Sequence, residues 1–440
     1  MTNKNLLHLA EELVTYGRKK GADEIEVSIG EAKEFSVEIR EGNIEKLIEA
    51  GDKGLSLKVI IDHRVATGFS SDLSKEILYY LIDSTIQRAK ISSLDPFSGL
   101  PEREEINVEV EKLKIFDPKI LELAPEKKIE AAKETEAICL ADKRIKKSYG
   151  SEFGTYTGTT YLTNSNGFSG SYQQTTCSCG VYLQSGDKNN LFDEGWYDFA
   201  RNLDDLMTPE AIAKKAIHRV TRLIGGRKIK TQNVPVVFEP PMTGSLLGFL
   251  YTCINGTNVY LKQSFLAEKL GRKIGNPLIT VIDDGLIPGA LGTKPFDREG
   301  VPTRKTFVIE KGILKNFLMD TYAAHKLKMH STGNGSGPNN FYLAPGEFTP
   351  EEIIKSVDKG LLLTGAIGQG TIPTTGDISR GAFGMWIEKG EIVYPVAEIT
   401  ISGNLGRILQ NIEMIGNDLE FRRPITGPTI KVGEMTIGGK

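Results

Sequence analysis

Apolar and polar residues alternate along four segments in the first quarter of the chain. These segments lie at 25–29, 35–39, 55–61 and 65–69. A period of two predicts strands with one buried face and one wet face, as in an antiparallel meander. Apolar residues at helical spacing precede the strands at 5–20 and follow them after Asp72. Residues 1–105 are therefore expected to form a small α+β domain.

Two further units follow along the chain. Residues 106–227 carry a charged helical segment, then a strand-rich stretch with Asn166-Gly167 as a hairpin signal, and form a second α+β unit. From Lys228 onward, apolar strands are separated by glycine-rich loops, with too few helices for a doubly wound parallel sheet. Residues 228–440 are therefore expected to form a larger domain on a mainly antiparallel sheet. Within it, the segment from Met242 to Gly256 is apolar nearly all round and predicts a buried helix.

The segment from Gly376 to Leu405 combines several signals. Glycines surround Asp377 and Arg380, an apolar run follows, and Lys389-Gly390 marks a turn before a second alternating run. This pattern predicts a β-hairpin with a polar loop at its entrance. Asn404 stands where a helix N-cap belongs, because apolar residues at helical spacing come after it.

Composition narrows the functional classes. The chain is 39% hydrophobic and 25% charged, with a net charge of −3 and a pI near 6.1. No stretch of lysine and arginine stands free of acidic neighbours, which argues against direct contact with nucleic acid. The first residues lack the pattern of a signal peptide, and no window is apolar enough to span a membrane. Four cysteines fit a reducing compartment, so a cytoplasmic location is expected.

Three motifs together resemble one known family. The segments Lys294 to Thr303, Ser331 to Gly335 and the hairpin from Gly376 are similar to the C-terminal region of the TldD/PmbA family. The likeness includes Gly21 to Ser28 and covers nearly the whole chain. Members of this family are described as metallopeptidase subunits and, in older naming, as modulators of DNA gyrase.

The resemblance implies a metal site that this chain does not reproduce. In TldD-type subunits, zinc is held by an HExxxH helix and a late cysteine, because two imidazoles one turn apart converge on a metal. The corresponding segment, Leu246 to Cys253, contains neither histidine nor glutamate, and no cysteine follows Cys253. The chain therefore resembles the TldE (PmbA) branch, with no metal and no catalytic residue of its own. Zinc is expected in a TldD-type partner subunit.

The resemblance also implies a substrate and an assembly. The family's peptidase is thought to admit unfolded peptides into a chamber between subunits, so a heterodimer with a TldD-type subunit, or a homodimer, is expected. Glycine-rich loops expose backbone groups that can pair with an extended peptide. The candidate peptide-binding residues are Gly333, Gly335, Gly368, Gly370, Gly376, Asp377, Arg380 and Gly381. Simple turn geometry, with a salt bridge between Asp377 and Arg380, is the competing interpretation.

Two other functions stay open from the residues alone. A self-sufficient homodimeric hydrolase could use carboxylates as metal ligands or bases, and the candidates are Asp283, Asp284, Asp297 and Asp377. Asp283 and Asp284 are adjacent in a strand, so they point to opposite faces and would not readily share one metal. A peptide-binding or regulatory protein without a catalytic partner is the third possibility.

Overall fold

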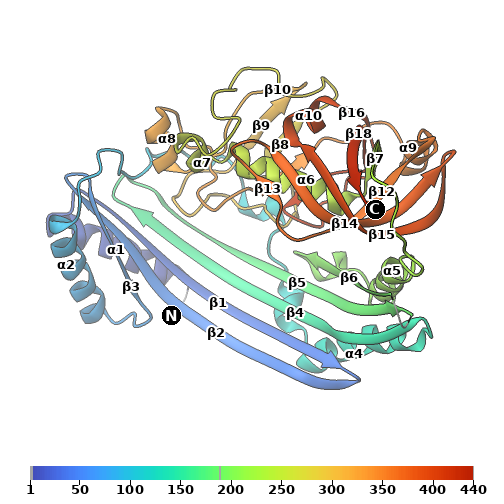
Figure 1. Cartoon of the computed structure of the whole chain (residues 1–440). Coiled ribbons are helices and arrows are strands. Elements are labelled where there is room, and N and C mark those ends of the chain that lie inside the picture. Colours follow the sequence, from blue (N-terminus) through green and yellow to red (C-terminus); the bar gives the residue numbers. More distant parts are fainter. Residues whose placement is uncertain (1–2, 188–189, 440) are drawn as a thin grey trace.

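A long, curved antiparallel sheet forms the N-terminal half of the protein (Figure 1). The computed structural model describes residues 3–187 and 190–439. The strand order of this sheet is β3-β2-β1-β4-β5-β6. Its strands are β1 (Glu24–Arg40), β2 (Asn43–Ile61), β3 (Arg64–Ser70), β4 (Ile145–Asn164), β5 (Ser169–Gly186) and β6 (Leu191–Ala200).

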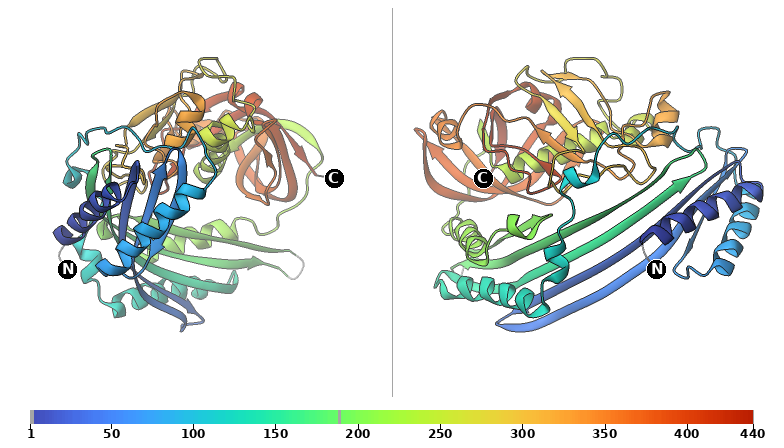
Figure 2. Two further views of the ribbon diagram at one scale, coloured as in Figure 1. Left: turned by 90° about the vertical axis from the view of Figure 1, so that its left-hand side faces the viewer. Right: turned by 180° about the vertical axis from the view of Figure 1, so that it is seen from behind.

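Helices cover one face of this sheet at its two ends (Figure 2). One pair is α1 (Asn3–Lys19) and α2 (Lys75–Ile91), and the other is α4 (Pro125–Ala141) and α5 (Pro209–Thr221). The first core contains Ile25, Val27 and Ile29 of β1. The second contains Phe35, Val37 and Ile39 of the same strand. All six are odd-numbered residues of one strand, so both pairs of helices lie on the same face.

The two expected N-terminal units therefore share one sheet. The first two alternating runs, predicted as separate strands, are the two ends of β1, and that prediction was wrong. Between them, Lys33 and Glu34 are exposed because no helix covers the middle of the sheet. Strand β1 also pairs with β4 from Glu26 opposite Asn164 to Ile39 opposite Ser151, which joins the 1–105 segment to the 106–227 segment.

Five strands of the C-terminal half close into a barrel. Strand β12 pairs with both β7 and β14, so the order β7-β18-β15-β14-β12 returns to its start. Four of the five pairings are antiparallel, and only β12 with β7 is parallel. The strands are β7 (Gln232–Phe238), β12 (Lys359–Ile367), β14 (Asp377–Glu388), β15 (Glu391–Asn404) and β18 (Ile430–Gly438), with β13 (Thr371–Ile372) and β16 (Ile412–Ile415) attached.

A second, smaller sheet lies beside the barrel, and α6 (Pro240–Ile254) shares a core with both. Its strands are β8 (Val281–Asp284), β9 (Lys305–Glu310), β10 (Ile313–Leu314), β11 (Asn340–Leu343) and β17 (Ile425–Thr426). The short helices are α3 (Pro118–Glu122), α7 (Gly256–Tyr260), α8 (Thr321–Leu327), α9 (Pro350–Lys355) and α10 (Leu405–Gln410), with 3-10 turns at Val110–Leu113 and Leu203–Asp205.

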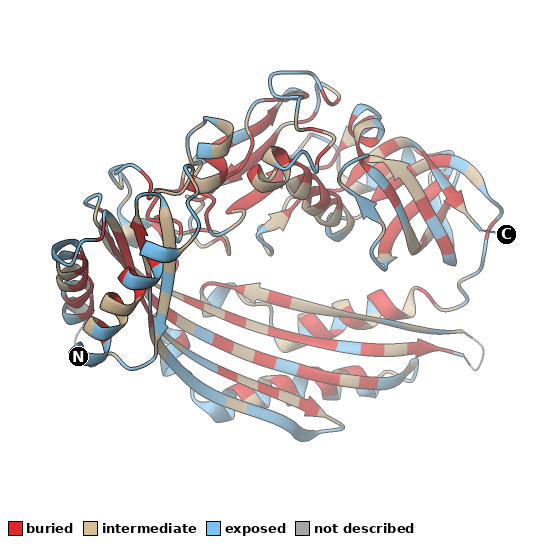
Figure 3. Ribbon diagram, turned by 60° about the vertical axis from the view of Figure 1, so that its left-hand side comes forward, coloured by how far each residue is buried: buried red, intermediate tan, exposed pale blue. Residues whose placement is uncertain are grey.

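These elements confirm the α+β fold and several local predictions. The buried helix predicted around Met242 to Gly256 is α6, and Figure 3 shows how much of the C-terminal half is buried around it. The predicted hairpin is formed by β14 and β15, and the side chain of Asn404 accepts a hydrogen bond from the backbone N–H of Gly406 at the start of α10. In the described part of the chain, no helix has the length and apolar character needed to cross a membrane.

Candidate functional site

Helix α6 is the element that connects the candidate site residues. It begins after Glu239 with two prolines, which suit the first helical turn because their missing N–H groups need no partner there. Its apolar residues, including Leu250 and Cys253, are buried in the core. The helix ends at Asn255, whose side-chain oxygen accepts a hydrogen bond from the N–H of Thr257 and so starts α7. Each end of α6 borders a different loop cluster.

The C-terminal end of α6 borders a polar cavity of about 360 Å³. Its lining residues are Tyr251, Asn255, Thr257, Arg298, Met319, Asp320, Asn334, Gly335, Ser336 and Gly337. The amide nitrogen of Asn255 donates to the hydroxyl of Tyr251 at 3.2 Å, which fixes the orientation of both side chains. Of the candidate residues, Gly335 lies in this lining and Gly333 lies two residues before it in the same loop.

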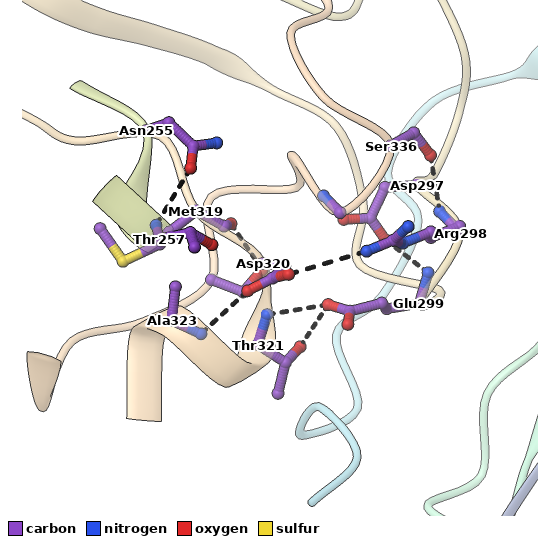
Figure 4. Close-up of polar contacts among 12 residues, drawn as sticks. Asn255, Thr257, Asp297, Arg298, Glu299, Met319, Asp320, Thr321, Ala323 and Ser336 are labelled. Carbon is purple, nitrogen blue, oxygen red and sulfur yellow. Dashed lines mark hydrogen bonds and ion pairs between the residues drawn. The ribbon is translucent and has the colours of Figure 1, made fainter. Parts of the chain in front are cut away.

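Arg298 provides the positive charge of this cavity (Figure 4). Its side chain is 67% exposed and forms an ion pair with Asp320 at 3.7 Å. Its backbone N–H donates to the hydroxyl of Ser336 at 3.0 Å, which ties the two family-like loops together. Asp320 also caps α8, since its other oxygen accepts from the N–H of Ala323 at 2.8 Å. A long ion pair at an exposed position leaves the guanidinium available to a ligand.

Buried carboxylates hold these loops in place. Asp297 accepts hydrogen bonds from the backbone N–H groups of Glu299, Val301 and Gly335 at 2.7 to 3.0 Å. Burial, followed by the charge of Glu299, raises the pKa of Asp297 to about 6. Glu299 in turn accepts from both the N–H and the hydroxyl of Thr321. The oxygens of these carboxylates are used to fix loop geometry.

Asp283 has the same structural role. It is fully buried and accepts one hydrogen bond from Asn334 and two from Asn339, each at 2.8 Å. Burial raises the pKa of its carboxyl, and the three donors oppose that rise. The neighbouring Asp284 instead accepts from the backbone of Leu286. The two side chains point apart, as expected for adjacent strand residues.

The N-terminal half of α6 borders the second cluster, which is built around Arg380. Its guanidinium donates to the carbonyl of Gly368 at 3.0 Å and to the hydroxyl of Ser245 at 2.9 Å. Together with apolar residues of α6 and the barrel, Arg380 and Ser245 line a small cavity. A Cβ on Gly370 would lie 1.7 Å from the carbonyl oxygen of Ser379, so only glycine permits this approach of the two backbones.

Asp377 and Arg380 do not pair with each other. They lie within strand β14, where the sequence predicted a loop, and residues three apart in a strand point to opposite faces. Asp377 accepts hydrogen bonds from the hydroxyl of Thr375 at 2.7 Å and from the amide of Asn404 at 2.9 Å. These contacts lower its pKa, with Thr375 as the larger cause. The alternative of a salt bridge between the two residues is therefore wrong.

The structure thus divides the candidate residues into two groups on either end of α6. Gly335 lines the polar cavity and Gly333 lies in the same loop, whereas the other candidates belong to the strands and turns around Arg380. These other candidates are Gly368, Gly370, Gly376, Asp377, Arg380 and Gly381. The sequence did not indicate that Tyr251, Arg298 and Asp320 line this cavity. Arg298 could have been found, because it lies inside the family-like segment from Lys294 to Thr303.

The side chains of α6 do not fit a zinc ion. Its face toward the Arg380 cluster presents Met242, Ser245 and Phe249, and none of these is an imidazole, thiolate or carboxylate. Cys253 is its one sulfhydryl, and burial raises the pKa of that thiol to about 12, so it is not a thiolate at neutral pH. Across the described residues, no group of three or more histidine, cysteine or acidic side chains is placed to hold a metal ion.

Comparison with known proteins defines the class of this chain. Residues 25–91, 118–224 and 231–439 match the first, central and C-terminal domains of PmbA/TldA metallopeptidases. The metalloprotease PmbA of Escherichia coli O157:H7 is 34% identical over 428 residues, which are 96% of this chain and 93% of that protein. The chain therefore has the three-domain architecture of these metallopeptidases. It belongs to the PmbA/TldD metallopeptidase family.

Solved structures agree with this assignment. A protein from Bacteroides thetaiotaomicron is 28% identical, with a TM-score of 0.92 and full coverage of both chains. TldE from Thermococcus kodakarensis is 24% identical, with a TM-score of 0.88 over 98% of this chain and 100% of that one. At this identity, the similarity to TldE establishes the shared fold alone.

Proposed function

We propose that this chain is the PmbA (TldE)-type subunit of a zinc peptidase, and that a TldD-type partner carries the metal. The observation that carries the proposal is the chemistry of α6, where the family's metal-binding helix is expected and no side chain suits zinc. The PmbA name of a relative that spans 96% of the chain supports the same branch. Four unpaired thiols fit the cytoplasmic location that forms part of this proposal.

We further propose that this subunit helps to bind unfolded peptide substrates. The polar cavity offers a guanidinium held by one exposed ion pair, together with side-chain hydroxyl and amide groups from two separate segments, 251–257 and 334–337. Such groups suit the carbonyls and carboxylates of an extended peptide, independent of its side chains. Arg380 and the adjacent glycines form a second contact region on the same helix, and Arg380 has a positioning role there.

Co-purification from the native host followed by zinc analysis tests this function. The purified chain alone is expected to retain no stoichiometric zinc after dialysis, and the complex with its partner is expected to contain zinc and cleave an unstructured peptide. Adding the chain to a TldD-type subunit should raise cleavage, and omitting it should abolish the increase. One zinc per chain retained by the isolated protein would overturn the partner-subunit assignment.

The same experiment decides between the other two functions. A self-sufficient hydrolase would cleave the peptide without any partner. The structure argues against this, because the oxygens of Asp283 and Asp297 are occupied by N–H donors. A purely regulatory peptide-binding protein would bind the peptide but recover no partner and promote no cleavage.

A further inference from the structure

The small cavity beside Arg380 is a pocket with an apolar floor and a polar mouth. Its floor is made of buried side chains from α6 and from the strands of the barrel. These include Leu246, Phe249, Leu363, Ile378, Ile401 and Met435. The other lining residues include Ser245, Ala366, Thr371 and Arg380, which are half-buried or exposed. The apolar interior is therefore reached from the surface through a rim that can form hydrogen bonds.

The volume of this pocket limits the size of the group that can enter it. The free space amounts to about 40 Å³. A single water molecule needs about 10–15 Å³ of such space, so the pocket has room for about three groups of that size. The branched end of a valine side chain fits this space, whereas an aromatic ring does not. Because the floor is apolar, a hydrocarbon group gains free energy when it leaves water for the pocket.

The mouth of the pocket has hydrogen-bond donors and no negative charge. Arg380 uses one N–H group for the carbonyl of Gly368 and another for the hydroxyl of Ser245. A guanidinium has further N–H groups beyond these, so donors remain for a ligand. Within the part of the chain that the structure describes, no carboxylate pairs with Arg380, and none of the lining residues is acidic. Such a mouth suits an oxygen acceptor, such as the carbonyl group of a peptide.

Exposed apolar side chains lie next to this mouth. Ile367 and Ile372 directly follow the lining residues Ala366 and Thr371 in the sequence. Their side chains are 63% and 51% exposed. Single exposed apolar residues need no explanation, but two of them beside one apolar pocket are typical of a ligand-binding surface. They can contact the residues of a peptide on either side of the one whose side chain enters the pocket.

We propose that this pocket selects a small, branched aliphatic side chain, such as that of valine, from an extended peptide. The side chain fills the space above the apolar floor, and Arg380 donates a hydrogen bond to the neighbouring peptide carbonyl and so positions the peptide. The inference rests on the proposed peptide-binding function and adds the kind of side chain that the Arg380 region prefers. The cavity at Arg298 is lined mainly by polar groups, so it is not the source of this preference.

Peptides that differ at a single position test this preference. Each is a short, fluorescently labelled chain of glycine and serine, which is flexible and has no aliphatic side chain of its own. Its central residue is valine, glycine or phenylalanine. In anisotropy titrations with the full chain, the valine peptide should bind at least about tenfold more tightly than the glycine peptide. The phenylalanine peptide should show no such gain, because its ring exceeds the space in the pocket.

Variants that fill or widen the pocket should change the preference in opposite ways. Ala366→Leu places a larger side chain in the lining and should remove the advantage of the valine peptide. Ile378→Val removes a methylene group from the floor at little cost in stability. A peptide with a central isoleucine should bind this variant about fourfold more tightly than it binds the parent. Ile399→Val makes the same change in the same core, outside the pocket lining, and should leave every affinity unchanged.

The possible outcomes separate this inference from the proposed function. If the parent binds the valine, glycine and phenylalanine peptides equally, the pocket preference is overturned and peptide binding stands. A valine preference that persists in Ala366→Leu, or affinities that change equally in Ile378→Val and Ile399→Val, would also overturn it. If none of the peptides binds, both the preference and the proposed peptide binding are wrong. Thermal unfolding shows whether each variant is folded, and if Ala366→Leu is not, Ile378→Val with its control decides the test.

Discussion

The guanidinium of Arg380 donates to the hydroxyl of Ser245 at 2.9 Å and so connects strand β14 to helix α6. This contact joins the segment that most resembles the family to the helix on which the family's metal is expected. Its geometry makes Arg380 a positioning residue, because Arg380 reaches both α6 and the carbonyl of Gly368 in the adjacent turn. A change at Arg380 can therefore alter the region around α6 without removing part of the core.

Replacing Arg380 with alanine should separate function from stability. Arg380 is half-buried and makes two hydrogen bonds, so Arg380→Ala should cost about 1 kcal/mol of unfolding free energy. Cleavage of an unstructured peptide by the reconstituted complex should nevertheless fall strongly. Arg272→Ala, which removes an exposed arginine elsewhere in this domain, should change neither quantity. Equal peptidase activity for the Arg380→Ala and parent complexes would remove the case for a role in substrate binding.

The ion pair in the polar cavity allows a substitution that should improve binding. Asp320→Asn keeps a good N-cap for α8 but removes the charge that holds Arg298 at 3.7 Å. The freed guanidinium should bind a peptide carboxylate up to about fivefold more tightly, since an exposed pair is worth at most about 1 kcal/mol. Fluorescence anisotropy with a labelled unstructured peptide measures this change.

One further variant and one modified peptide make that measurement specific. Arg298→Ala should weaken binding of the same peptide, and amidation of the peptide's C-terminus should remove the advantage of Asp320→Asn. Because the side chain of Arg298 is 67% exposed, Arg298→Ala should leave the unfolding temperature nearly unchanged. If Asp320→Asn and Arg298→Ala both bind the peptide as the parent does, the cavity is not a peptide site.

Local features could be predicted from the sequence because their signals are local. The hairpin of β14 and β15, the cap at Asn404 and the buried helix α6 each follow from a pattern within a few turns or strands. The loop expected around Asp377 was a strand instead. Glycines lie there because neighbouring backbones approach closely, and close approach of backbones occurs in sheets as well as in turns.

Features that depend on distant contacts could not be predicted. The barrel closes only because β12 pairs in parallel with β7, which places Leu361 opposite Val236. The polar cavity combines Tyr251, Arg298 and Asp320 from three separate segments, and no spacing in the sequence indicates that they meet. Likewise, the two alternating runs at 25–29 and 35–39 were not recognised as one strand. The middle of the sheet has no helix over it, so the residues between the runs do not continue the alternation of buried and exposed positions.

Glu26 should make the protein less stable as the pH rises. It is buried on β1, one of its oxygens has no hydrogen-bond partner, and Lys58 lies 3.9 Å from the other. Burial raises the pKa of Glu26 to about 7, Lys58 lowers it, and the nearby Glu299 and Asp297 raise it further. In the unfolded chain the pKa of this carboxyl lies near its ordinary value of 4.5. Between these two values the folded state binds the extra proton, so the unfolding free energy falls with increasing pH.

Glu26→Gln should remove this pH dependence. The variant should gain up to about 3 kcal/mol over the parent at pH 8 and nearly nothing at pH 4, because a shift of one pKa unit corresponds to about 1.4 kcal/mol. Denaturant unfolding at a series of pH values provides the comparison. Glu34→Gln, an exposed glutamate on the same strand, should follow the parent at every pH. A gain that is the same at pH 4 and pH 8 would show that ionisation of Glu26 is not its source.

Glu136 should be the main support of the hairpin between β1 and β2. Its buried carboxylate, on α4, accepts hydrogen bonds from the backbone N–H groups of Glu41 and Gly42. Both of these residues have positive φ angles, 51° for Glu41 and 77° for Gly42. Glu136→Ala removes both acceptors and leaves a cavity, which should cost about 2–4 kcal/mol of unfolding free energy. Glu136→Gln retains the shape and one acceptor oxygen, so it should cost about half as much.

Hydrogen exchange can locate the effect of these substitutions. In Glu136→Ala, the amides of Glu41 and Gly42 and the adjoining ends of β1 and β2 should exchange much faster than in the parent, because the turn is no longer held. Amides near Ile25, at the far end of β1 under α1 and α2, belong to the other core and should keep their protection. Glu134→Ala, at an exposed position of the same helix, is the matched control and should leave both regions unchanged. Faster exchange spread evenly over both ends of the sheet would instead mean that Glu136 stabilises the whole domain rather than this turn.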